Sequence, residues 1–531
     1  MSGDLLALEL TFVELLLLVF IVAMAAHRIK LPYTVALVLV GLALSFQETI
    51  RFELTPEIIL LLFLPPLVFE AALHIDYHTF RKVLTPVLLL AVFGVLITMG
   101  VVFGILYMTS LLDWRTALIF ASLIAATDPV AVVSLFKALG APKRLATLVE
   151  SESLFNDATT IVVFHLITGA LFVSGATELD LNLIEAVKQF LFVALGGIGI
   201  GIVSGVLANL IFSHVDDHLI EITLSTIVAY GAYLLAEQFH LSGVLAVVFA
   251  GMLIGNRSDE SMSPTTRMVL MNFWEYIAFL ANSLVFILIG MEVVFPTLKQ
   301  QILLLIGAAV AAVLISRAVS VYGLSFVSRL LRNRVSFAYQ HILFWGGLRG
   351  AVSLALALSI PRTYPGRQTI LTLTFAVVLF TLLVQATTIS PLLRKLGLTG
   401  QSEAEKEYER IHARLLAARA AYSRLKQEYE HGALDPAAWQ TVQVELSDRI
   451  RELKQQMHDF TEKHPELAAR ITTSLRREAL LLQRATIIDL ERQGAISDDV
   501  TREIITEIDA EIEQLRQTTP ALPVASEQTS P

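Results

Sequence analysis

The 531-residue sequence contains no cysteine, so the chain can form no disulfide, thiolate nucleophile or cysteine-ligated zinc or iron–sulfur site. Charged residues are also scarce, at 16% compared with about 25% in soluble domains. Hydrophobic residues make up 55% of the chain, and the mean hydropathy is +0.67. This composition indicates a chain that lies largely within a membrane.

The few charges are unevenly distributed. Residues 401–531 hold 17 basic and 24 acidic residues, whereas the first 400 residues hold only 22 and 24. We therefore predict a transmembrane domain over 1–398 and a helical cytoplasmic regulatory tail over 399–517. Residues 518–531, rich in Pro, Ser and Thr, are expected to be disordered. The acidic tail argues against nucleic acid as a partner.

Apolar segments follow one another through the first 400 residues, and a membrane span needs about 20 such residues. Thirteen candidates lie near 5–27, 33–47, 55–74, 84–109, 116–138, 146–173, 184–212, 218–237, 241–256, 270–294, 301–328, 336–360 and 368–393. The first segment is interpreted as a membrane helix rather than a cleaved signal, because its basic residues follow it. The sequence thus predicts an all-α membrane protein with about 13 transmembrane helices.

Basic residues are concentrated in alternate connections between these segments. One set of connections holds twelve: Arg28, Lys30, Arg81, Lys82, Lys137, Lys143, Arg144, Arg257, Arg267, Arg329, Arg332 and Arg334. The other set holds five: Arg51, Arg115, Lys299, Arg362 and Arg367. Because basic loops stay in the cytoplasm, thirteen spans place the N-terminus outside and the tail inside.

A polar pair, Asn156 and Asp157, lies inside an otherwise apolar segment. An ionisable residue at bilayer depth costs about 2.5–3.5 kcal/mol on insertion scales, so it marks a functional site by default. Its carboxylate and amide oxygens are hard ligands of the kind that alkali cations prefer. Burial disfavours the charged form of Asp157. A proton and a cation can therefore compete for this one group, although a structural salt bridge is the alternative.

Thr127-Asp128-Pro129 interrupts a second apolar segment. Proline removes a backbone hydrogen bond, and membrane helices tolerate the break where it lines a cavity. Asp128 can cap the half-helix that begins there, where a negative charge suits the helix dipole. Two interpretations stay open for Asp128, a capped kink without a ligand and a part of a binding site. Thr127 offers a hydroxyl and a carbonyl oxygen to a cation.

Arg349 lies in a third apolar segment, flanked by Gly346, Gly347 and Gly350. Its guanidinium is charged at any useful pH and needs a carboxylate partner. Glu152, about one and a half turns before Asp157, can supply that partner and leave Asp157 free. The reverse assignment, with Arg349 on Asp157, stays open.

Two further charged residues occur within apolar segments. Glu70 follows the Pro65-Pro66 break, as a candidate ligand or as an interface carboxylate that faces water. Arg317 is interpreted as an interface or packing group.

Together these motifs resemble the monovalent cation/proton antiporters of the NhaP/NHE (Na⁺/H⁺ exchanger) family, over residues 10–395. The resemblance implies two inverted repeats with crossed discontinuous helices, assembled as a homodimer in the plasma (inner) membrane. It implies a secondary transporter rather than an enzyme, with no cofactor and with Na⁺ (or K⁺ or Li⁺) and H⁺ as substrates. Exchange would take place at one alternating-access carboxylate site, without net charge movement, and would serve pH and salt homeostasis.

The same resemblance implies roles for individual residues. Na⁺ would be held by Asp157, Thr127, Ser153 and Glu70, with Asp157 binding cation and proton in turn. Asn156 and Asp128 would hold and cap the site, and Glu152 would pair with Arg349. A K⁺(Na⁺)/H⁺ antiporter of the same fold is one alternative and a cation channel is another, although a channel would not need a titrating carboxylate.

Overall fold

The computed structural model describes residues 2–29, 33–45, 55–172, 183–215, 217–261, 264–291, 300–331, 333–398, 403–492 and 495–518. The chain divides into two compact units, Met1–Leu396 and Gly397–Pro531. Both units are helical, and within the described residues the one β-bridge joins Asp128 to Leu348. The predicted all-α membrane architecture is therefore confirmed.

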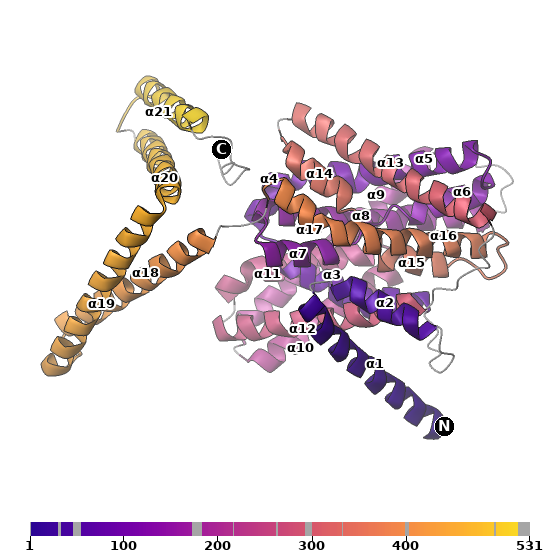
Figure 1. The fold of residues 1–531 in the computed structure, drawn as a ribbon, viewed down its shortest axis with the longest axis horizontal. Helices are drawn as coiled ribbons and strands as arrows, with labels where there is room; N and C mark the ends of the chain where they lie inside the picture. The colour runs from indigo at the N-terminus through magenta and orange to yellow at the C-terminus, as the bar shows by residue number, and fades with distance from the viewer. Residues whose placement is uncertain are drawn as a thin grey trace. The chain divides into compact units, whose positions relative to one another are not determined.

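The first unit is a bundle of long helices (Figure 1). Its elements are α1 (Ser2–Ile29), α2 (Tyr33–Ser45), η1 (Ile58–Phe63), α3 (Leu64–Leu73), α4 (Tyr77–Leu88), η2 (Leu89–Phe93), α5 (Gly94–Met108), α6 (Trp114–Leu123), α7 (Val130–Leu139), α8 (Lys143–Phe172), α9 (Leu183–Phe212), α10 (His218–Gln238), α11 (Gly243–Ser261), α12 (Pro264–Met291), α13 (Gln300–Leu330), α14 (Phe337–Trp345), α15 (Ala351–Leu358), α16 (Arg367–Phe380), η3 (Thr381–Gln385) and α17 (Ala386–Lys395). Here η marks a π-helical turn.

Seven described helices are long and apolar enough to cross a membrane. They are Tyr77–Met108, Lys143–Phe172, Ile184–Phe212, His218–Gln238, Thr266–Met291, Gln301–Leu330 and Arg367–Lys395. Five shorter apolar helices accompany them: Val13–Ala26, Tyr33–Leu44, Ile58–Leu73, Val130–Leu139 and Gly243–Asn256. The exact count of thirteen spans stays a prediction. One predicted boundary shifts clearly, because α4 already begins at Tyr77, capped by Asp76, and so includes Arg81 and Lys82.

Two helices are broken, and the breaks meet. Residues 124–129 separate α6 from α7, and residues 346–350 separate α14 from α15. The backbone amide of Asp128 donates to the carbonyl of Leu348 at 2.9 Å, which joins the two extended segments. Such crossing of discontinuous helices frees backbone groups inside the bundle, where a substrate can meet them.

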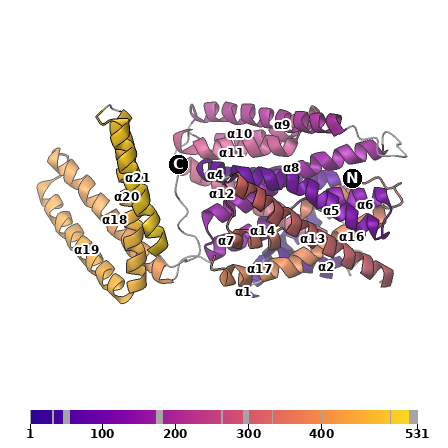
Figure 2. The same cartoon turned by 90° about the horizontal axis from the view of Figure 1, so that it is seen from above.

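A proline in α3 leaves one backbone carbonyl without its usual helical hydrogen-bond donor. Pro66 has no amide hydrogen, so it cannot donate to the carbonyl of Leu62 one turn earlier. The hydroxyl of Tyr230, on α10, donates to that carbonyl at 3.0 Å instead. Close packing also joins α9 to α11 along one side of the unit (Figure 2). A Cβ atom on Gly197 would collide with the carbonyl of Ser242, just before α11, and one on Gly201 with the carbonyl of Ala246 in α11. These glycines therefore serve close helix packing.

The second unit contains α18 (Glu403–Glu430), α19 (Pro436–Lys463), α20 (Pro465–Arg492) and α21 (Asp498–Thr518). Asp435 caps α19, because its carboxylate accepts from the amides of Ala437 and Ala438. The Trp439 ring packs against the Tyr422 and Tyr429 rings, which joins α18 to α19. Apart from Thr518, the segment predicted to be disordered lies outside the described residues.

Candidate functional site

Asp157 lies in the middle of α8, the most enclosed long helix of the bundle together with α12. The side chain is 9% exposed, and its Oδ1 atom has no hydrogen-bond partner among the described residues. A buried carboxylate oxygen without a partner is costly, because desolvation is then uncompensated. The arrangement is that of an oxygen held ready for a proton or a cation.

Two hydroxyl groups lie together beside this carboxylate. The Oγ1 atom of Thr127 and the Oγ atom of Ser153 are 3.2 Å apart, and both side chains are buried. The backbone amide of Thr127 also faces the Asp157 carboxylate. The break after α6 and the helix α8 thus bring three of the predicted ligand residues into one place.

Asp128 lies directly before Pro129, the N-cap residue of α7, and its carboxylate caps a free amide at the start of that helix, as one of the two interpretations of the sequence predicted. Its Oδ1 atom accepts from the amide of Val130 at 2.9 Å, at the first residue of α7. A Cβ atom on Gly350 would collide with the Asp128 carboxylate. Glycine at position 350 therefore allows the two broken helices to approach each other here.

Asn156 is buried one residue before Asp157, and its side chain bonds within α8. The hydroxyl of Thr160 donates to Asn156 Oδ1 at 3.4 Å. A neutral amide in this position adds no second charge next to Asp157.

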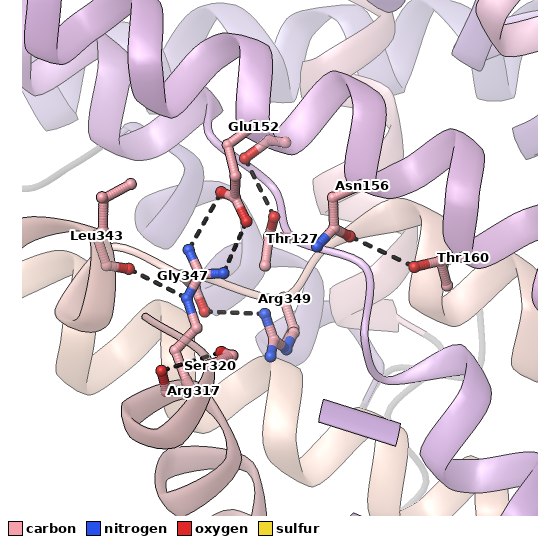
Figure 3. Close-up of polar contacts among 10 residues, drawn as sticks. Thr127, Glu152, Asn156, Thr160, Arg317, Ser320, Leu343, Gly347 and Arg349 are labelled. Atoms are coloured by element: carbon pink, nitrogen blue, oxygen red, sulfur yellow. Dashed lines mark hydrogen bonds and ion pairs between the residues drawn. The ribbon is translucent and has the colours of Figure 1, made fainter. Parts of the chain in front are cut away.

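Glu152 has a different partner from the one we predict from the sequence. Its two carboxylate oxygens accept from the guanidinium of Arg317, on α13, at 2.7 and 3.1 Å (Figure 3). Arg317 Nε donates to the carbonyl of Leu343 at 3.1 Å, so three of the guanidinium's donors are used. The predicted Glu152–Arg349 ion pair is therefore wrong, and Arg317 is not merely a packing or interface group.

The geometry explains why Glu152 pairs with Arg317 and not with Arg349. Gly347 has no side chain, and a Cβ atom there would lie 2.5 Å from Arg317 Nε. Arg317 therefore passes over the break between α14 and α15 to reach α8. An arginine that lies alone in a long apolar segment was the available signal in the sequence, because such a residue needs a buried carboxylate.

Arg349 is fully buried and is held mainly by its backbone. Its amide donates to the hydroxyl of Thr381 at 3.1 Å, and its Nη1 atom donates to the carbonyl of Gly347 at 3.3 Å. Its Nε atom has no partner among the described residues. The charges of Glu152 and Asp157 act on its guanidinium, although neither carboxylate forms an ion pair with it within the described part of the chain.

Glu70 lies on another helix, α3, and pairs locally. Its Oε1 atom is 3.3 Å from Nδ1 of His74, one turn later on the same helix. Within the described residues, no hydrogen bond or ion pair joins Glu70 to Thr127, Ser153 or Asp157. In this conformation Glu70 therefore stands apart from the other predicted ligands.

The family model described as "Sodium/hydrogen exchanger, transmembrane" matches residues 15–395 of this chain. The chain belongs to the sodium/hydrogen exchanger family. It is a cation/proton antiporter, and hence a transporter rather than an enzyme, as the sequence motifs predict.

Curated relatives within the exchanger family match most of the chain. The Na⁺/H⁺ antiporter NhaG of Bacillus atrophaeus is 37% identical over 527 residues, 96% of each chain. The low-affinity Na⁺/H⁺ antiporter NhaS1 of a Synechocystis strain is 36% identical over 484 residues, 90% of this chain and 91% of that one. The solved structure of the sodium proton antiporter MjNhaP1 from Methanocaldococcus jannaschii has the same fold. It has a TM-score of 0.58 and 21% identity, and covers 74% of this chain and 100% of the other.

Proposed function

We propose that this exchanger moves Na⁺ against H⁺ at the single carboxylate of Asp157, by alternating access and without net charge movement. The observation that carries the proposal is the buried Oδ1 atom of Asp157, which has no hydrogen-bond partner in the part of the chain that the structure describes. One group that binds either ion couples the two flows by competition. A site with a charged Asp157 and no bound ion would reorient poorly between the two faces of the membrane, because the bare carboxylate carries a desolvation cost.

The remaining ligands for Na⁺ are neutral oxygens. Thr127 and Ser153 supply hydroxyls that are 3.2 Å apart beside Asp157. Glu70 would approach only in another stage of the cycle, since its carboxylate is engaged with His74 here. Asn156 and Asp128 hold the local backbone, the latter through its cap on Val130.

Electroneutral exchange follows from how the other charges are used. The ion pair of Glu152 with Arg317 is bidentate and buried, so the negative charge of this carboxylate is balanced within the protein. Asn156 supplies an amide where a second carboxylate would add a charge. One titrating carboxylate then exchanges one Na⁺ for one H⁺.

The working form is expected to be a homodimer in the plasma (inner) membrane, with the N-terminus outside and the tail in the cytoplasm. Na⁺ and H⁺ are its substrates, and no resident cofactor is needed. Several relatives that cover most of this chain bear the name Na⁺/H⁺ antiporter, which supports Na⁺ as the cation. The tail, residues 399–517, would regulate exchange.

Exchange measured in proteoliposomes tests this function. Asp157→Asn should abolish Na⁺-driven proton flux while the protein stays folded in detergent. Asp217→Asn is the matched control, because Asp217 caps α10 and asparagine caps equally well. Residual exchange by Asp157→Asn above the protein-free background would contradict the role of Asp157. Parallel assays with K⁺ and Li⁺, and with a chain ended at residue 398, test the cation and the tail.

A further inference from the structure

The two broken helices occupy equivalent places in the chain. In each half, a long helix precedes the break and another long helix follows it. The first half runs α4–η2–α5, the broken pair α6 and α7, and then α8. The second half runs α13, the broken pair α14 and α15, and then the continuous α16–η3–α17. The helix after each break therefore has an equivalent in the other half.

In each half, this following helix places a side-chain oxygen near a backbone amide in the preceding break. In the first half the oxygen belongs to the Asp157 carboxylate and the amide to Thr127, 30 residues earlier. In the second half the oxygen is the hydroxyl of Thr381, which accepts from the amide of Arg349, 32 residues earlier, at 3.1 Å. Thr381 thus stands in the second half where Asp157 stands in the first.

The hydroxyl of Thr381 is fully used. It accepts from Arg349 and donates to the carbonyl of Val378 at 2.9 Å, and the side chain is 1% exposed. Thr381 is also the first residue of the π-helical turn η3, and such turns recur at functional sites. Without this oxygen, the amide of Arg349 would be buried with no acceptor.

Arg349 depends on this backbone anchor. Its side chain makes one long hydrogen bond, to Gly347, and its Nε atom has no partner among the described residues. Its charge nevertheless acts on Asp157. The position of the Arg349 backbone therefore decides how its positive charge lies relative to the proposed exchange site.

We propose that Thr381 is a positioning residue for cation exchange, which fixes Arg349 through its hydroxyl and thereby sets the affinity of the Asp157 site for the cation. Thr381 occupies the position equivalent to Asp157 and has a neutral hydroxyl. The second half of the protein therefore stabilises its broken helix without adding a second titrating group. This inference rests on the proposed function of Asp157.

Three variants test the role of Thr381 in proteoliposomes. Thr381→Val removes the hydroxyl at nearly constant volume, and Thr381→Ser keeps it. Thr374→Val is the matched control, because Thr374 is equally buried on α16 and its hydroxyl bonds only to the carbonyl of Ile370. Thr381→Val should raise the apparent KM for Na⁺ about tenfold, as for a lost buried hydrogen bond, and Thr381→Ser should restore it.

A purely structural role would give a different result. It would lower the maximal rate, through a smaller active fraction, and leave KM unchanged. Three results would overturn the proposal. They are a lower maximal rate with an unchanged KM in Thr381→Val, an equal rise of KM in Thr374→Val, and no recovery of KM in Thr381→Ser. If Thr381→Val does not fold, Thr381→Ala, which fits the same space, carries the same comparison. Loss of exchange in Asp157→Asn with an unaltered KM in Thr381→Val would refute the role of Thr381 alone, whereas exchange by Asp157→Asn would refute the proposed site.

Discussion

Arg317 binds both carboxylate oxygens of Glu152, with Nη1–Oε1 and Nη2–Oε2 distances of 2.7 and 3.1 Å, across the interface between α13 and α8. Both side chains are buried. Removing one member leaves a buried charge, which costs about 3–5 kcal/mol. Arg317→Met should therefore destabilise the protein by this amount in denaturant unfolding in detergent micelles.

The pairing itself can be tested by rescue. Glu152→Gln added to Arg317→Met should recover much of the lost stability, because no charge is then left unpaired. The same Glu152→Gln added to Arg349→Ala should give no such recovery. The opposite pattern of rescue would show that Glu152 pairs with Arg349.

Gly347 provides the space through which Arg317 reaches Glu152. A Cβ atom there would lie 2.5 Å from Nε and 3.1 Å from Cζ of Arg317. Gly347→Ala should displace the guanidinium and destabilise the protein by about 1–3 kcal/mol, as overpacking does. Gly323→Ala on α13 is the control, because no heavy atom lies within 4 Å of its added Cβ atom. Equal melting temperatures for the two variants in detergent would contradict this account.

Asp128 should be needed for its oxygen rather than for its charge. Asn can accept from the amide of Val130 as Asp128 does, whereas Ala cannot. We expect Asp128→Ala to cost about 1 kcal/mol and Asp128→Asn only a few tenths, with exchange largely kept in Asp128→Asn. Measuring Na⁺-driven proton flux for both variants in liposomes tests whether the oxygen or the charge of Asp128 is needed. If Asp128→Asn were as inactive as Asp157→Asn, the charge of Asp128 would belong to the exchange site.

Asp76 gives a pH dependence outside the membrane spans. Its hydrogen bond from the Thr79 hydroxyl, together with those from the amides at the start of α4, lowers the pKa of this carboxyl below its ordinary value. Because the folded protein holds the carboxylate form, the stabilisation is present above the unfolded pKa and is lost as the pH falls through the lowered folded pKa. Asp76→Ala should cost about 1 kcal/mol near pH 7.

That cost should shrink as the pH falls below about 4, because Asp76 then becomes protonated in the unfolded chain while the folded protein still holds the carboxylate. Melting temperatures of both proteins in detergent between pH 3 and 7 check this. A difference in melting temperature that stays constant down to pH 3 would show that the charge of Asp76 does not contribute.

Local residues are sufficient to predict the breaks in the helices, whereas the crossing of the breaks is implied only by the family resemblance. Pro129 and the glycines around Arg349 act locally, through a missing amide hydrogen and missing side chains, so the breaks follow from neighbouring residues alone. The bridge from Asp128 to Leu348 joins residues 220 positions apart. Its existence depends on the packing of the whole bundle, which no local pattern encodes.

Local sequence patterns also cannot decide whether Arg317 or Arg349 pairs with Glu152. Both arginines lie in apolar segments of the sequence, and both need a carboxylate by the same electrostatic argument. Their partners are decided by the rotation of α13 and by the free space at Gly347, which are properties of the packed bundle. The buried position of Asp157, in contrast, follows from its apolar surroundings in sequence.

The three π-helical turns have a consequence for sequence change along these helices. Each π turn contains one residue more than an α-helical turn would, and each α-helical residue advances the helix by about 100°. Deleting one residue within Thr381–Gln385 would remove that surplus, so the turn could close as ordinary α-helix. The side chains of α17 could then keep their orientation relative to α16, whereas the same deletion in an α-helical turn would rotate them by about 100°. The surplus residue of η3 thus makes this turn the place where the helix best tolerates the loss of one residue.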